Sequence, residues 1–193
     1  MIEIAGYLSG VAILLSFVPY IRDVFLHKTK PERISWLIWS ILGLISFFSQ
    51  WAKGGEYSLI LTGAQVVGDF GVFLLALKFG LGGFFFRDKL AIVGMATGLL
   101  LWFFTKEPLF ALFIAILIDA IGVWLTVMKT FEQPETETTS AWWLTLLGGF
   151  FGLLAVDPSN RVLFVFPIYI CFASTSILLA IYFGKQFKKK LMI

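Results

Sequence analysis

The chain has 193 residues, of which 59% are hydrophobic and only 14% are charged, and its formal net charge is +3. A soluble domain of this size carries about 25% charged residues, so the composition excludes a chain that is surrounded by water on all sides. We therefore expect an all-α integral membrane protein, because only helices and closed barrels satisfy their backbone hydrogen bonds within a bilayer.

Seven apolar runs are long enough to cross a bilayer, which requires about 17–25 largely apolar residues. In chain order, the expected transmembrane helices cover residues 4–25, 34–52, 57–79, 89–105, 108–130, 139–156 and 161–184. The fourth and fifth runs must be separate helices, because one helix of about 40 residues is far longer than a tilted span. The break falls at Lys106, Glu107 and Pro108, and proline suits the first position of a helix.

The basic residues predict the orientation of the chain. If the N-terminus lies outside, twelve of the fifteen Lys and Arg residues fall on the cytoplasmic side, and only Lys53, Lys106 and Arg161 fall outside. We therefore expect a protein of the plasma (inner) membrane with its N-terminus outside and its C-terminus in the cytoplasm. The basic segment at 185–190, KQFKKK, is interpreted as a stop signal for the last helix or as a contact with anionic lipid headgroups.

The helices fall into two similar groups of three. The first three begin near residues 4, 34 and 57, and the last three begin near 108, 139 and 161, with almost the same intervals. Near the end of each group, FLLALKFG (73–80) matches ILLAIYFG (177–184) at five of eight positions. We expect a first three-helix repeat at 1–80, a linker helix at 81–106 and a second repeat at 107–193. A single linker helix makes the repeats parallel (3+1+3), an arrangement found in transporters whose substrate site lies between the repeats.

Two aspartates inside apolar helices are the strongest candidates for functional residues. Asp69 ends a polar stripe of Ser58, Thr62 and Gln65 on one helix face, and Asp119 lies in the middle of the fifth helix. An ionised aspartate at the centre of a span costs about 2.5–3.5 kcal/mol, and no Lys or Arg lies at a matching depth. Each aspartate is therefore expected to be protonated, hydrated in a cavity, or hydrogen-bonded by Gln, Tyr or Ser/Thr neighbours. It then serves proton coupling and substrate binding, or it only ties two helices together.

Polar and aromatic residues on the inner helix faces complete the expected site, although small residues also serve helix packing alone. The predicted substrate-binding residues are Asp69, Gln65, Thr62, Trp39, Ser46, Asp119, Thr145 and Ser174. Pro19 and Pro167 are expected to act as hinges or static kinks, because proline removes a helix hydrogen bond. The second helix of each repeat also carries tryptophans that stack on a substrate or anchor the helix at the interface: Trp36, Trp39, Trp142 and Trp143.

The layout resembles that of the PQ-loop/MtN3 superfamily, which includes SWEET sugar transporters, lysosomal amino-acid exporters and KDEL receptors. The resemblance rests on the 3+1+3 grouping, on Pro19 near the cytoplasmic end of the first helix, and on PYIRDVFLHKTKPERISW (19–36) and DAIGVWLTVMKTFEQPETETTSAWW (119–143). The Pro-Gln pair of the family reads Pro19-Tyr20 in the first repeat and Leu125-Thr126 in the second. Asp69 stands in the region where SWEETs place an asparagine. The resemblance implies a central cavity lined by both repeats and a rocking motion between outward-open and inward-open states.

Two functions remain open from the sequence. The first is a transporter or facilitator for a sugar, amino acid or vitamin-like metabolite that works by alternating access and is linked to protons through Asp69 or Asp119. The second is a receptor or accessory protein that binds a ligand without moving it. We do not expect an enzyme, a metal or a cofactor, because His27 is the single histidine and no metal or nucleotide motif is present. The expected partners are a small molecule, membrane lipid and further copies of the chain, without nucleic acid.

Overall fold

The computed structural model describes residues 1–81 and 108–191, together with residues 89, 92–93, 96–97, 100 and 103–104. Within these residues the protein is all-helical, which confirms the predicted fold class at that level. The α-helices are α1 (Ile2–Phe25), α2 (Arg33–Ala52), α3 (Leu59–Phe79), α5 (Pro108–Glu132), α6 (Thr139–Leu154) and α7 (Val165–Leu191). Two short 3-10 helices, η1 (Pro134–Thr136) and η2 (Arg161–Phe164), precede α6 and α7. The expected linker helix at 89–105 lies for the most part outside the described residues.

The helices run almost as far as their hydropathy predicts. The spans 2–25, 33–52, 59–79, 112–132 and 161–190 are each long and apolar enough to cross a membrane, as expected of an integral membrane protein. The sixteen residues of α6 form a shorter apolar helix. The basic segment 185–190 was predicted to follow the last span, and in the structure it continues α7 as helix.

Local chemistry explains both ends of α2. Its first turn is capped by Glu32, whose carboxylate accepts hydrogen bonds from the backbone N–H of Ser35 at 2.6 Å and from the Ser35 hydroxyl at 2.8 Å. At the other end, Gly54 adopts a positive φ of 80°, and the N–H of Gly55 bonds the carbonyl of Gln50 at 2.9 Å. A left-handed glycine with such a bond is a common way to end a helix.

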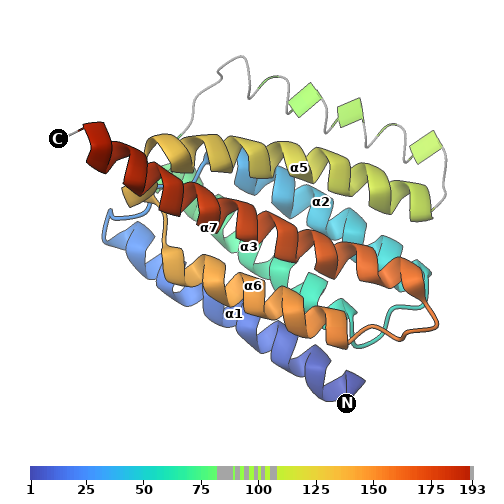
Figure 1. Ribbon diagram of the computed structural model, residues 1–193. Helices are drawn as coiled ribbons and strands as arrows, with labels where there is room; N and C mark the ends of the chain where they lie inside the picture. Colours follow the sequence, from blue (N-terminus) through green and yellow to red (C-terminus); the bar gives the residue numbers. More distant parts are fainter. Residues whose placement is uncertain are drawn as a thin grey trace.

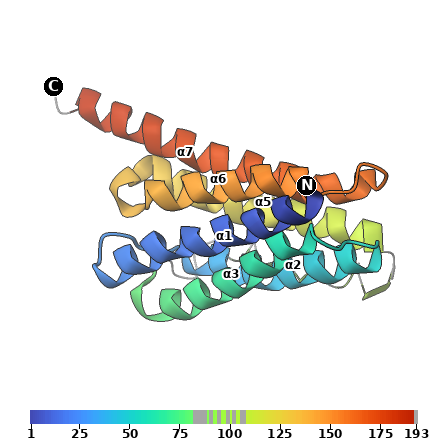
Figure 2. The same cartoon turned by 90° about the horizontal axis from the view of Figure 1, so that it is seen from below.

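The six helices form a closed ring in which each one packs against two neighbours. The order around the ring is α1, α3, α2, α5, α7, α6 and back to α1. As Figure 2 shows, α2 and α3 lie on one side of the bundle and α6 and α7 on the other. We refer to α1, α2 and α3 as the first group of helices and to α5, α6 and α7 as the second group. The two groups meet along two interfaces, α1 with α6 and α2 with α5.

The two termini lie at opposite ends of the bundle, and α2 and α6 run opposite to the other four helices (Figure 1). We call the end at which α2 and α6 begin the basic end, because most of the described basic residues lie there: Arg22, Lys28, Lys30, Arg33, Lys78, Lys129, Lys185, Lys188, Lys189 and Lys190. The opposite end carries the α2–α3 and α6–α7 connections.

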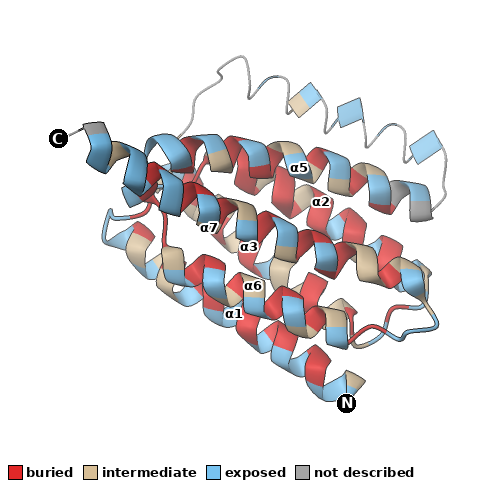
Figure 3. Ribbon diagram, viewed as in Figure 1, coloured by how far each residue is buried: buried red, intermediate tan, exposed pale blue. Residues whose placement is uncertain are grey.

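The helices of the ring carry both exposed and buried residues (Figure 3). Many of the exposed side chains are large and apolar, whereas several polar side chains are buried. Large side chains such as Val18, Phe70, Phe150 and Phe172 are more than half exposed, and Thr62, Gln50 and Ser9 are fully buried. This reverses the pattern of a water-soluble bundle and fits a surface that is solvated by lipid.

Glycines bring neighbouring helices into backbone contact. At Gly184 of α7, a Cβ atom would lie 2.6 Å from the carbonyl oxygen of Phe131 in α5. At Gly71 of α3, a Cβ atom would meet nothing within 4 Å. Both glycines lie within helices, so the two positions differ mainly in the space available for a side chain.

We therefore predict that Gly184→Ala destabilises the protein by about 1–3 kcal/mol, because backbone cannot move aside as a side chain can. Gly71→Ala, the matched control, should leave stability unchanged or raise it, since alanine favours helix. Thermal unfolding of the purified variants in detergent measures both effects. Equal stability of the two variants would show that α5 and α7 do not pack as described.

Candidate functional site

A cavity lies between the two groups of helices and receives side chains from all six α-helices. It encloses about 650 Å³ of empty space, counting the part that is open to the outside. The residues that line it are Ser16, Phe17, Tyr20, Trp36, Trp39, Gly43, Gln65, Asp69, Asp119, Val123, Ala141, Trp142, Thr145, Phe166, Tyr169, Ile170, Ala173, Ser174 and Ile177. A largely apolar and aromatic lining with a few polar groups is typical of a site for a small molecule.

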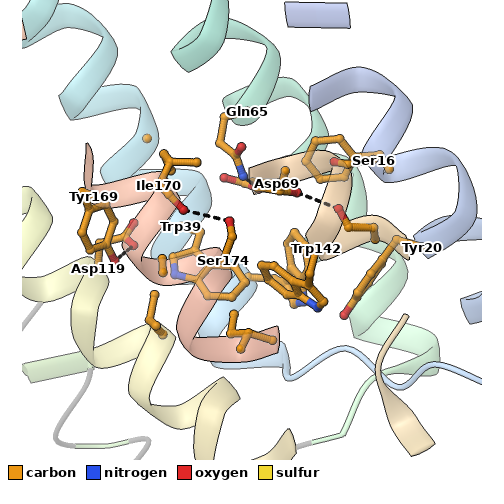
Figure 4. Close-up of a pocket in the computed structure, with 18 of the residues that line it drawn as sticks. Ser16, Tyr20, Trp39, Gln65, Asp69, Asp119, Trp142, Tyr169, Ile170 and Ser174 are labelled. Atoms are coloured by element: carbon orange, nitrogen blue, oxygen red, sulfur yellow. Dashed lines mark hydrogen bonds between the residues drawn. The ribbon is translucent and has the colours of Figure 1, made fainter. Parts of the chain in front are cut away.

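Asp69 and Asp119 both face this cavity, from α3 and α5 respectively (Figure 4). Asp69 is 2% exposed, and its carboxylate accepts a hydrogen bond of 2.9 Å from the side-chain amide of Gln65, one turn earlier in α3. Asp119 is partly buried and accepts a hydrogen bond from the hydroxyl of Tyr169 in α7. Each carboxyl group thus has one polar partner, and both line the same cavity.

No Lys, Arg or His is found among the described residues that line the cavity. Nor do the described residues include a group of three His, Cys, Asp or Glu side chains placed to hold a metal ion. The two carboxyl groups therefore face an apolar, aromatic space without a cationic side chain beside them. Carboxylates in such surroundings attract a proton or another cation.

Four aromatic side chains line the cavity on the side of the basic end and form a closed ring of contacts. The ring centroids are 5.0 Å apart for Tyr20 and Trp36, 4.9 Å for Trp36 and Trp39, 6.1 Å for Trp39 and Trp142, and 6.5 Å for Trp142 and Tyr20. All four side chains are less than 9% exposed. We call this set the aromatic ring. It joins α1 and α2 to α6, across the interface between the two groups of helices.

A polar network connects the same two groups beyond the aromatic ring, at the basic end. The ammonium group of Lys129 bonds the buried carboxylate of Glu137 and, at 3.0 Å, the carbonyl of Lys30. Glu137 also accepts a 2.8 Å hydrogen bond from the indole N–H of Trp142, which ties the network to the aromatic ring. The hydroxyl of Thr138 donates to Asp23 at 3.0 Å. The connection after α5 is thereby fastened to the connection after α1.

Six of the eight predicted substrate-binding residues lie around the cavity, and two do not. The six are Asp69, Gln65, Trp39, Asp119, Thr145 and Ser174. Thr62 instead accepts a 3.0 Å hydrogen bond from Gln50, which also donates to the carbonyl of Ser46 at 3.1 Å. Thr62 therefore belongs to the packed α2–α3 interface, and Ser46 is buried within α2 outside the cavity lining.

The two predicted hinge prolines lie outside the cavity lining. Pro19 is within α1 and directly precedes Tyr20 of the aromatic ring. Pro167 lies near the junction of η2 and α7, where the backbone already changes from a 3-10 helix to an α-helix. Of the two prolines, Pro19 alone lies in the interior of a regular helix, toward its C-terminal end.

Sequence reasoning missed several residues that the cavity depends on. Tyr169, the partner of Asp119, and the flanking Phe166 received no role, because an aromatic residue in an apolar helix carries no signal of its own. Among the tryptophans, Trp36, Trp39 and Trp142 are buried, whereas Trp143 is 59% exposed and remains a candidate for an interfacial anchor. Glu137, in the acidic connection between α5 and α6, is buried and paired with Lys129.

The Lys129–Glu137 pair gives a prediction for stability. Lys129→Met leaves a buried carboxylate without its counter-charge and should cost about 3–5 kcal/mol. Adding Glu137→Gln removes that charge and keeps an acceptor for Trp142, so the double variant should be more stable than Lys129→Met alone. Unfolding of the unmodified protein, the two single variants and the double variant in detergent tests this. If the losses simply add, the two side chains do not interact.

Comparisons of the chain with protein-family models, with curated proteins and with solved structures found no match.

Proposed function

We propose that this protein is a small-solute membrane transporter or facilitator that works by alternating access, with its substrate site in the cavity around Asp69 and Asp119. One observation carries the proposal: a cavity that is lined by both groups of helices and holds two carboxyl groups within a bundle whose outer surface is apolar. Ionisable side chains inside a membrane bundle mark substrate or ion pathways far more often than they serve packing.

The order of the helices supports the proposed duplication. Exchanging α1 with α5, α2 with α6 and α3 with α7 converts each neighbouring pair of the ring into another neighbouring pair. A two-fold relation between the groups 1–80 and 107–193 therefore fits the contacts. A linker helix at 81–106 would place both groups in the same orientation and complete seven spans. Parallel repeats with a binding site between them are one of the architectures that secondary transporters use.

Membership of the PQ-loop/MtN3 superfamily is part of the same proposal. Pro19 next to the cavity residue Tyr20 supports it, because a proline there would let the end of α1 bend as the cavity opens. The second group has Leu125 and Thr126 at the corresponding place, so only the first group carries the proline. Any bending at these positions would be unequal between the two groups.

The contacts at the basic end fit one state of an alternating-access cycle. The aromatic ring and the Lys129–Glu137 network both join the two groups of helices at this end. Opening toward the basic end would have to separate Trp142 from Trp39 and Tyr20, and the connection at Thr136–Thr138 from that at Thr29–Lys30. We propose that this end faces the cytoplasm in the plasma (inner) membrane, as the excess of basic residues predicts. The arrangement is then closed on the cytoplasmic side.

Transport by the purified protein in proteoliposomes tests the proposal. Uptake from a panel of sugars, amino acids, amines and vitamins should exceed that of empty liposomes for at least one compound, and it should depend on pH. Asp69→Asn should abolish the pH-dependent uptake, because the asparagine cannot exchange a proton.

Glu132→Gln is the matched control, since it removes a carboxyl group that is exposed and does not line the cavity. Saturable binding of a compound without any flux would support the receptor function instead. A complete panel with neither flux nor binding would contradict both functions.

A further inference from the structure

The charge of the residues that line the cavity restricts the class of ligand that it can bind. It presents two carboxyl groups, and none of its described lining residues is basic. The described basic side chains of the six helices and their connections lie in end turns, in connecting segments or in the basic segment 185–190, with Lys129 held by Glu137. A ligand in this cavity therefore meets negative charge that no side chain of the described lining neutralises.

The presence of two carboxyl groups in one cavity strengthens the need for a counter-charge. Because Asp69 and Asp119 line the same apolar space, two ionised carboxylates there would repel each other. Their hydrogen bonds, from Gln65 to Asp69 and from Tyr169 to Asp119, come from neutral groups and supply no positive charge. The counter-charge must come from outside the lining, as a proton or as a cation.

Hydrogen-bonding groups around the cavity offer acceptors in preference to donors. The hydroxyls of Ser16, Thr145 and Ser174 donate to carbonyls of their own helices, at 2.7, 3.1 and 2.8 Å. The side-chain oxygen of Gln65, an acceptor, is buried without a hydrogen-bond partner among the described residues. The hydroxyl of Tyr20, which can donate or accept, is buried in the same way. Together with the two carboxyl groups, the Gln65 oxygen is suited to receive N–H donors from a ligand.

Aromatic faces supply the second half of a cation site. Tyr20, Trp36, Trp39 and Trp142 gather on one side of the cavity, and Figure 4 shows Trp39, Trp142 and Tyr20 around the same space as the two aspartates. The face of an indole or phenol ring attracts a cation within about 6 Å, most strongly when water is excluded. Carboxylates combined with such rings recognise a positively charged nitrogen that carries apolar substituents.

We propose that the substrate is a small organic cation without a carboxylate, namely an aromatic or quaternary amine. The assignment rests on the proposed function and names its substrate class. The charged nitrogen binds between Asp69 and Asp119, and the apolar part of the ligand lies against the aromatic ring. A sugar leaves the negative charge uncompensated, and an amino acid adds a third carboxylate where no basic side chain receives it.

A matched set of ligands tests this on the full chain in lipid nanodiscs, by isothermal titration. Phenylethylamine, 2-phenylethanol and phenylalanine share the same ring and differ in charge. Phenylethylamine should bind at least about tenfold more tightly than either of the others. This is the ratio expected when a cationic ligand forms even a weak ion pair with a buried carboxylate. Tetramethylammonium tests whether the positive charge suffices without N–H donors.

Variants identify the groups responsible. Asp69→Asn and Asp119→Asn should each weaken phenylethylamine binding by about tenfold or more and leave the binding of 2-phenylethanol unchanged. Glu132→Gln, with its exposed carboxyl group outside the cavity, should change neither. In the unmodified chain, phenylethylamine should bind more weakly as the pH falls, because protons compete for the carboxylates. The titratable groups that face the site are Asp69 of α3, Asp119 of α5, Tyr20 of α1 and Tyr169 of α7.

The outcomes separate the two proposals. Equal binding of phenylethylamine and 2-phenylethanol, or tighter binding of phenylalanine or a sugar, overturns the cation assignment and leaves transport standing. Binding of phenylethylamine without flux in proteoliposomes overturns transport and keeps the cation assignment. If neither amine binds in the unmodified chain, the assignment is wrong whatever the behaviour of the variants.

Discussion

Two carboxyl groups in an apolar bundle are the constraint on which the rest of the structure depends. A charge at this depth cannot be screened by lipid, so every element around it must supply polarity, aromatic surface or space. Gln65 stands one turn before Asp69 and bonds it within α3, while Tyr169 reaches Asp119 from the neighbouring helix α7. The first interaction is local in sequence, and the second exists only because α5 and α7 adjoin in the ring.

This difference explains how much of the site was predictable. The stripe of Thr62, Gln65 and Asp69 identified the inward face of α3, since a polar face in lipid must turn toward protein. A polar stripe identifies the inward face of a helix, however, and does not show which of its residues reach the cavity. Thr62 instead faces Gln50 in the α2–α3 interface. Tyr169 and the aromatic ring could not be found in this way, because their roles follow from which helices are neighbours.

The fold was predictable to a similar extent and for a similar reason. Hydropathy placed six helices close to their observed ends, because each must span the same thickness of hydrocarbon. The buried Lys129–Glu137 pair escaped prediction because both residues lie close to a helix end, where charged side chains ordinarily meet water. It is buried here because the connections after α1 and α5 fold against each other, with Lys129 also bonded to the carbonyl of Lys30.

The two aspartates also break the symmetry that the proposed duplication would give. The exchange that maps α3 onto α7 and α5 onto α1 places Ala173 opposite Asp69 and Ile13 opposite Asp119, and neither carries charge. Ala173 lines the cavity, and Ile13 is fully buried. The cavity is thus shared by both groups, while one carboxyl group comes from each at positions that do not correspond. A ligand of the proposed class, held between them, would contact both groups of helices through charge. Its binding energy would then depend on the distance between the two groups, as the proposed rocking motion requires.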